Sequence, residues 1–223
     1  ANKRKFNGSI SLLITGDEEG VAINGTKKVV EYLKKKKEKI DFCLVGEPTN
    51  PNKLGEMIKI GRRGSMTGRL SIFGVQGHVA YPQRANNPST AIVQILKELK
   101  EIKIDNGTRD FQPTNLEVTK ININNSADNV IPGLANATFN IRFNNKHSSN
   151  SIKKKIDKII KRICNKNKSK YKIDYSVSGE AFLTKPNNTT FMIRDIIKKI
   201  TKIKPQLSTT GGTSDARFIR DIA

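Results

Sequence analysis

Hydrophobic and polar positions follow two different patterns along the chain. In the first part, apolar runs at residues 9–15 and 41–45 flank the segment 25–36, where apolar residues recur at helical spacing among lysines. This pattern predicts a buried strand, an amphipathic helix and a second buried strand. Such a β-α-β unit is typical of a doubly wound sheet.

From Gly64 the pattern changes to strands with one exposed face and to amphipathic helices. The predicted order is β-α-β-β-α-β, the ferredoxin-like signature, with elements at 66–73, 88–101, 115–123, 134–143, 150–165 and 171–177. Helical spacing returns at about 189–201, and another helix begins at 216. We therefore predict an α/β protein in which a ferredoxin-like domain, residues 64–178, is inserted into an α/β domain formed by residues 1–63 and 179–223.

The composition narrows the choice of partners. The net charge is +21, from 41 Lys and Arg against 20 Asp and Glu, but the lysines are spread along the whole chain together with Ile and Asn. We see no face that interleaves basic and aromatic residues, and no apolar run approaches the length of a membrane span. We expect neither a nucleic-acid nor a membrane partner, although the charge favours anionic ligands.

The cysteine pattern favours a reducing compartment. Cys43 and Cys164 are the only cysteines, and neither has CxxC spacing. A disulfide framework or a cysteine-based zinc site is therefore not expected, and a cytoplasmic location fits.

Acidic residues follow both predicted strands of the first part. Asp17, Glu18 and Glu19 come directly after Gly16, and Glu47 comes after Gly46. Ligands of open α/β sheets bind beyond the carboxyl ends of strands, so these carboxylates could share one crevice. Adjacent carboxylates repel one another unless protons, cations or solvent relieve them. The acids could belong to the first turn of a helix, or they could form a metal site with a built-in base.

Six stretches taken together resemble the M20 family of zinc-dependent exopeptidases and deacylases. They occur in the family's order and span nearly the whole chain: Thr15-Gly16-Asp17-Glu18-Glu19, Val45-Gly46-Glu47-Pro48, Gly61-Arg62-Arg63-Gly64-Ser65, Gly74 to Pro82, Asn129 to Gly133, and Thr209 to Asp215. The resemblance implies part of a zinc-exopeptidase-like α/β catalytic domain, with the ferredoxin-like domain as a lid used for dimerisation.

The resemblance also implies catalytic and metal-binding roles. Glu18 would take a proton from a water and pass it to the leaving amine. Glu19 and Glu47 would each bind one of two zinc ions, with cobalt as an alternative at one site. The histidine matching His78 reaches the site from the partner subunit's lid and helps to stabilise the tetrahedral oxyanion. Activity would then require a homodimer.

The expected substrate is a small anionic N-acyl amino acid. Arg62 and Arg142 suit carboxylates because a guanidinium can grip one bidentately. Further candidate substrate-binding residues are Tyr81, Asn129, Gly212 and Thr213. Within the family, the motifs favour the removal of succinate from N-succinyl-LL-2,6-diaminopimelate, a step of lysine and diaminopimelate biosynthesis.

The resemblance leaves the metal site incomplete within this chain. The family's other metal ligands, two histidines and a bridging Asp, would lie before residue 1 and after residue 223, so we expect a fragment that is inactive alone. Three alternatives stay open: another deacylase of the family such as acetylornithine deacetylase, a non-catalytic dimerisation module built on residues 64–178, and a nucleic-acid binder driven by the net charge.

Overall fold

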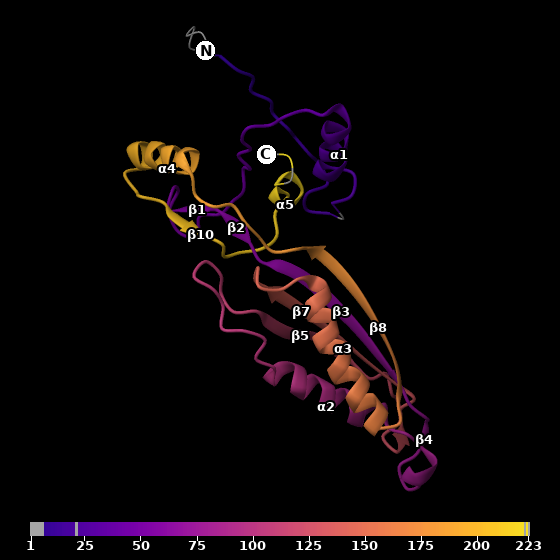
Figure 1. Ribbon diagram of the computed structural model, residues 1–223. Helices are drawn as coiled ribbons and strands as arrows, with labels where there is room; N and C mark the ends of the chain where they lie inside the picture. The colour runs from indigo at the N-terminus through magenta and orange to yellow at the C-terminus, as the bar shows by residue number, and fades with distance from the viewer. Residues whose placement is uncertain (1–6, 21, 221, 223) are drawn as a thin grey trace. The chain divides into compact units, whose positions relative to one another are not determined.

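The computed structural model describes residues 7–20, 22–220 and 222, and the chain divides into two compact units. One unit contains the residues up to Glu47 together with those from Ser214 onward, and the other contains Pro48–Thr213. Figure 1 shows the elements of both. The predicted boundaries at 63/64 and 178/179 stay a prediction.

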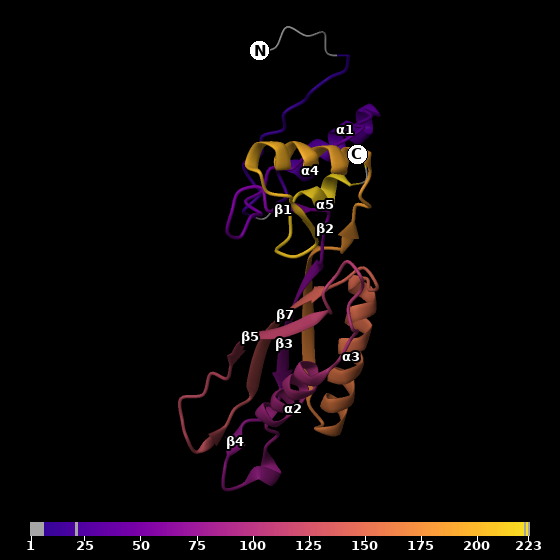
Figure 2. The ribbon, with the colours of Figure 1, turned by 90° about the vertical axis from the view of Figure 1, so that its left-hand side faces the viewer.

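The second unit contains the ferredoxin-like fold that the sequence predicts. Four strands form an antiparallel sheet in the order β5-β7-β3-β8, and helices α2 and α3 pack against it and against each other. Both helices cover the same face of the sheet (Figures 1 and 2). The elements are β3 (Gly64–Phe73), α2 (Pro88–Glu101), β5 (Asn115–Asn122), β7 (Leu134–Phe143), α3 (Ser149–Lys166) and β8 (Lys170–Gly179).

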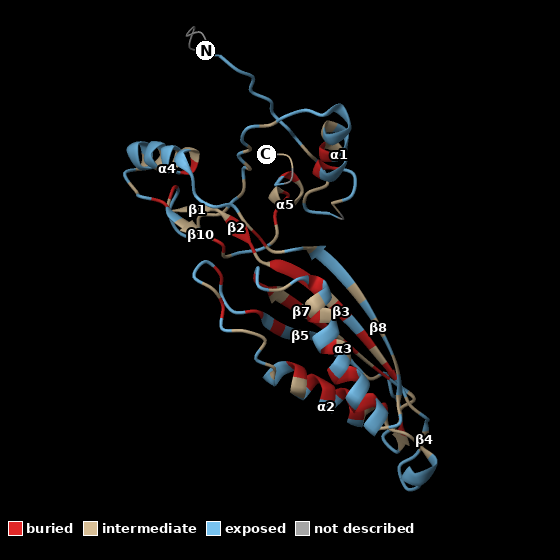
Figure 3. Ribbon diagram, in the orientation of Figure 1, coloured by how far each residue is buried: buried red, intermediate tan, exposed pale blue. Residues whose placement is uncertain are grey.

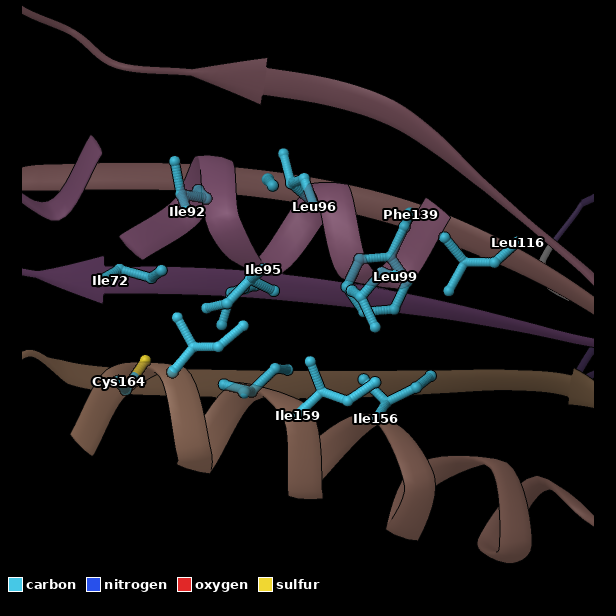
Figure 4. Packing of buried hydrophobic residues seen from close by; sticks show 14 of the residues in the cluster. Ile72, Ile92, Ile95, Leu96, Leu99, Leu116, Phe139, Ile156, Ile159 and Cys164 are labelled. Carbon is cyan, nitrogen blue, oxygen red and sulfur yellow. The ribbon is translucent and has the colours of Figure 1, made fainter. Parts of the chain in front are cut away.

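The hydrophobic core lies between this sheet and its two helices (Figure 3). Residues of β3 are alternately buried and accessible over its second half, since successive side chains of a strand point to opposite faces. In α3 the buried isoleucines recur at intervals of three and four residues, the spacing of one helix face. Figure 4 shows how they pack with Ile95 and Leu99 of α2 and Phe139 of β7.

Polar caps fix where the two helices begin. The Asn87 side chain accepts a hydrogen bond from the backbone N–H of Ser89, and Pro88 occupies the first helical turn of α2. Ser148 and Ser151 form a capping box at the start of α3.

The first unit differs from its prediction. The predicted helix is present as α1 (Thr26–Lys36), but residues 9–15 and 41–45 form no strands. Ile10, Leu12 and Ile14 are each more than four-fifths exposed. A strand needs neighbours for its backbone hydrogen bonds, and no described segment pairs with either stretch. The prediction of a buried β-α-β unit is therefore wrong for this chain.

The remaining described elements are as follows. Strand β1 (Met57–Lys59) pairs in parallel with β10 (Gln206–Ser208), while β2 (Gly61–Arg62) and β4 (Gly77–His78) pair antiparallel with β9 (Phe182–Leu183) and β6 (Val130–Ile131). The helical elements are η1 (Pro82–Arg84), α4 (Asn188–Thr201) and α5 (Ala216–Ile219). None of the described helices is long and apolar enough to cross a membrane.

Candidate active site

In the first unit, three carboxylates act on a fourth, that of Glu18. Burial raises the pKa of Glu18, and the negative charges of Glu47, Glu19 and Asp215 raise it further. The two Gly-acid stretches therefore do bring carboxylates together, although neither stretch follows a strand. Sequence reasoning did not assign a role to Asp215, which closes the motif Thr209 to Asp215 and is buried.

Asp17 has a local structural role. Its Oδ2 accepts hydrogen bonds from the backbone N–H groups of Ile23 and Asn24, both at 2.8 Å. The side chain thus holds the turn that follows the acids, which leaves Glu18 and Glu19 as the members of the stretch available for chemistry.

The acidic cluster suits a cation but does not complete a metal site. Glu47 Oε1 is buried and has no hydrogen-bond partner among the described atoms. A buried oxygen of this kind is suited to contact a cation. A zinc ion usually takes four ligands, however, and the described residues contain no group of three or more His, Cys, Asp or Glu side chains that could hold one. The assignment of Glu19 and Glu47 as metal ligands stays a prediction.

A second cluster, in the other unit, is basic and surrounds the segment Thr209–Thr213. Arg62 is buried, and its Nη1 donates to the carbonyl oxygen of Thr210 at 3.1 Å. Lys59 Nζ donates to Thr210 Oγ1 at 2.8 Å, and burial together with the charge of Arg62 lowers the pKa of Lys59. Sequence reasoning missed Lys59; its place two residues before the Gly61-Arg62 motif was the available signal.

The glycines of this segment leave room beside the guanidinium. Gly211 has a φ of +103°, and a Cβ there would lie 2.7 Å from Arg62 Nη1. A Cβ at Gly212 would meet nothing within 4 Å, so this backbone is open to a ligand. Arg62, Gly212 and Thr213, predicted separately from the sequence, therefore belong to neighbouring segments.

Arg142, the second arginine predicted to bind substrate, lies close to another cation, Arg63. In β7, Arg142 pairs with Ser65 of β3, and its Nε donates to Asn140 Oδ1 at 3.1 Å. Burial lowers the pKa of Arg63, and the charge of Arg142 lowers it further. Arg63 Nη1 also donates to Asn115 Oδ1 at 2.8 Å, so the structure associates Arg63, rather than Arg62, with Arg142.

His78, Tyr81 and Asn129 form a third group. The exposed His78 accepts the backbone N–H of Ala80 at Nδ1, at 3.0 Å, and its ring centroid lies 6.0 Å from that of Tyr81. The Asn129 carbonyl accepts the N–H of Val79 at 3.0 Å, which holds the two loops together. Asn129 therefore lies near His78, and its role in binding substrate stays a prediction.

Strand β3 separates the third group from the basic cluster. Arg62 stands two residues before its first residue, Gly64, whereas β4 follows its last residue, Phe73. Figure 1 shows β2 and β4 at opposite ends of the sheet. Ten strand residues span about 30 Å, so one chain does not bring His78 and Arg62 to the same small substrate.

Comparison with known proteins agrees with this architecture. Among solved structures, an aminopeptidase PepT from Bacillus cereus is similar with a TM-score of 0.65 and 15% identity, covering 78% of this chain and 45% of that one. A tripeptidase from Staphylococcus aureus gives a TM-score of 0.63 and 17% identity, covering 75% and 43%. At these identities the likeness concerns the fold alone.

Sequence relatives are much closer. A succinyl-diaminopimelate desuccinylase of Pelagibacter ubique is 80% identical over 99% of this chain, and one of Parvibaculum lavamentivorans is 52% identical over 100% of it. The chain spans 57% and 56% of the length of these relatives. Residues 60–168 match the peptidase dimerisation domain of the M20 family. The chain is therefore similar over nearly its whole length to these two desuccinylases, and over residues 60–168 to the M20 dimerisation domain.

Proposed function

We propose that the full-length protein that contains this chain is a metal-dependent amide hydrolase that removes succinate from N-succinyl-LL-2,6-diaminopimelate. The observation that carries this proposal is the 80% identity, over 99% of the chain, to a protein named succinyl-diaminopimelate desuccinylase. The proposal includes a cytoplasmic location, a place in lysine and diaminopimelate biosynthesis, and two zinc ions per subunit with cobalt as an alternative at one site.

The acidic cluster supplies the proton chemistry in this proposal. Metal ions bound by Glu19 and Glu47, with ligands from outside the chain, would polarise the amide carbonyl and acidify a water. The Glu18 carboxylate would take a proton from that water and give it to the leaving amine. The raised pKa of Glu18 supports this assignment, because a general base works best when its pKa lies close to the operating pH.

The basic residues would hold the ends of the substrate. N-succinyl-diaminopimelate carries several carboxylates, and the segment Thr209–Thr213 with Arg62 presents a guanidinium and an accessible glycine backbone. Arg142 would bind a further carboxylate.

The third group would act across a homodimer. His78, Tyr81 and Asn129 lie at the end of the sheet remote from Arg62, so they would complete the site of a second copy. The match to a peptidase dimerisation domain over residues 60–168 supports this arrangement.

An assay of the full-length protein tests the proposal. Purified protein loaded with zinc should hydrolyse N-succinyl-LL-2,6-diaminopimelate in preference to N-acetylornithine, measured as kcat/KM for each. Glu18→Gln keeps the size of the side chain but cannot take a proton, so kcat should fall by at least about 100-fold. Glu38→Gln, an exposed acid just after α1, is the matched control and should leave kcat unchanged.

Two results would contradict the proposal. A preference for N-acetylornithine would indicate a sibling deacylase. No hydrolysis of either substrate, together with no zinc binding in a titration, would favour a non-catalytic dimerisation module.

A further inference from the structure

A buried network ties the basic cluster to a loop of the ferredoxin-like fold. We define this loop as residues 105–115, which follow α2 and end at the first residue of β5. It has no counterpart among the motifs recognised in the sequence, and His147, which contacts it, had no predicted role. All of the contacts described below lie within the unit Pro48–Thr213.

Asp105 fixes the start of the loop. Its Oδ1 accepts the backbone N–H of Gly107 at 2.6 Å and the side-chain amide of Asn144 at 2.7 Å, and both oxygens lie 3.3 Å from the N–H of Thr114. His147 Nε2 donates to Oδ2 at 3.0 Å, and the two side chains are only 13% and 7% exposed. One carboxylate therefore closes both ends of the loop and binds it to the β7–α3 connection.

The loop between these ends is compact. The N–H of Thr108 donates to the carbonyl of Phe111 at 2.8 Å, and the N–H of Phe111 donates back to Thr108 Oγ1 at 3.0 Å. Phe111 is 3% exposed, and Lys146 Nζ donates to the carbonyl of Gly107 at 2.9 Å. These contacts hold the loop's carbonyl groups in fixed directions.

One of these carbonyls meets the proposed substrate segment. The buried Thr209 hydroxyl donates a hydrogen bond to the carbonyl oxygen of Asp110. Thr209 directly precedes Thr210, whose carbonyl and hydroxyl accept from Arg62 and Lys59. A displacement of Thr209 would therefore move the backbone against which both cations lie.

We propose that loop 105–115, held by Asp105 and His147, positions the segment Thr209–Thr213 for substrate through the hydrogen bond from Thr209 to Asp110. Thr209, Asp105 and His147 are positioning residues: they touch no reacting atom and act through Arg62 and the glycine backbone. The inference rests on the proposed function, because the positioned segment is the one assigned to the substrate carboxylates.

Thr209→Val in the full-length enzyme tests the link. The variant keeps the shape of the side chain and removes the hydroxyl donor, so KM should rise about five-fold while kcat changes less than two-fold. Thr209→Ser restores the donor and should bring KM back to within about two-fold of the original value. Thr119→Val is the matched control, because it also removes a hydrogen bond from a threonine hydroxyl to a backbone carbonyl. That carbonyl belongs to Thr138, and the bond lies on the sheet, away from the segment Thr209–Thr213. The KM of this variant should not change.

A merely structural role would give a different pattern. If Thr209→Val lowered the melting temperature and left KM unchanged, or if Thr209→Ser failed to restore KM, the proposal would be overturned.

Amide hydrogen exchange tests the positioning independently of activity. His147→Leu removes the donor to Asp105, so the amides of peptides covering residues 206–213 should exchange several-fold faster than in the unmodified protein. His147→Gln keeps a side-chain N–H, so the same peptides should exchange more slowly in this variant than in His147→Leu. Unchanged exchange in His147→Leu would overturn the inference even if the protein had no desuccinylase activity. Inactivity of the unmodified protein would instead count against the proposed function alone.

Discussion

At the residue scale, two glycines allow β3 and β7 to carry phenylalanines toward the helices. Gly64 pairs with Phe143 and Gly68 with Phe139, and a Cβ at either glycine would overlap the ring of its partner. The rings of Phe139 and Phe143 are fully buried in the core cluster. The sequence motif Gly61 to Ser65 was assigned to function, but its Gly64 also has this packing role.

Replacing Gly68 by Ala tests this packing. The added methyl group would meet the Phe139 ring within a sheet whose backbone is fixed on both sides, so the free energy of unfolding should fall by about 1–3 kcal/mol. Urea unfolding of the full-length protein measures the change. In Gly133→Ala the nearest atom to the new methyl lies 3.8 Å away, and stability should change by less than about 0.5 kcal/mol. Equal effects at both positions would contradict this account.

At the element scale, the sequence was informative wherever an element finds its partners within the chain. The helix at 88–101 was predicted with the bounds it has, and the predicted order of strands and helices in residues 64–178 is the observed order. Here periodicity and packing agree, since the four strands and two helices bury one another's apolar faces.

The same reasoning failed at residues 9–15 and 41–45. Their apolar runs are as typical of buried strands as those of β7, yet Leu12 is 85% and Leu44 71% exposed. The hydrophobic pattern indicates which residues favour burial. It does not indicate whether another segment is present to pack over them. For the candidate site, the motifs that resemble the M20 family predicted roles for Arg62 and for residues of the Thr209–Thr213 segment, and those roles stay predictions. The motifs did not include Lys59 or loop 105–115, because only the tertiary structure brings these residues to the segment.

Loop 105–115 should make stability sensitive to acid. Burial of the Asp105 carboxyl opposes its ionisation, but donors from Thr114, Gly107 and Asn144 outweigh that effect and lower its pKa to about 2, from 3.8. A carboxyl whose pKa is lower in the folded state stabilises the fold above pH 4, and that contribution disappears as the pH falls from about 4 to 2. The loss should amount to about 2 kcal/mol.

Asp105→Asn separates this carboxyl from the other acids of the chain. The variant should be less stable than the unmodified protein at pH 7, and the difference between the two should shrink when unfolding is measured between pH 4 and pH 2.5. Asp128→Asn, which changes an exposed acid near β6, should show no such convergence. A pH-independent difference for Asp105→Asn would mean that the loss is one of packing rather than of charge.

At the scale of the whole molecule, the length of β3 is the feature that matters for function. The ferredoxin-like sheet places Arg62 before one end of the strand and His78 beyond the other, about 30 Å away. A rigid antiparallel sheet with a continuous core does not fold back on itself to close that distance. If both residues act on one substrate, they must come from different copies of the chain.

Subunit mixing measures whether they do. Full-length Glu18→Ala and His78→Ala variants should each be nearly inactive, because one lacks the proposed base and the other lacks the proposed donor to the oxyanion. In a mixed dimer, the site of the His78→Ala subunit keeps its Glu18 and receives the intact His78 of its partner. Random exchange makes about half of the dimers mixed, each with one working site, so activity should recover to about a quarter of the unmodified level.

Mixing two preparations of His78→Ala controls for refolding and should recover nothing. If the mixture of the two variants also stayed inactive after verified subunit exchange, His78 would have to act within its own chain. A rearrangement of the loops that carry His78 would then have to close the distance that β3 imposes between His78 and Arg62.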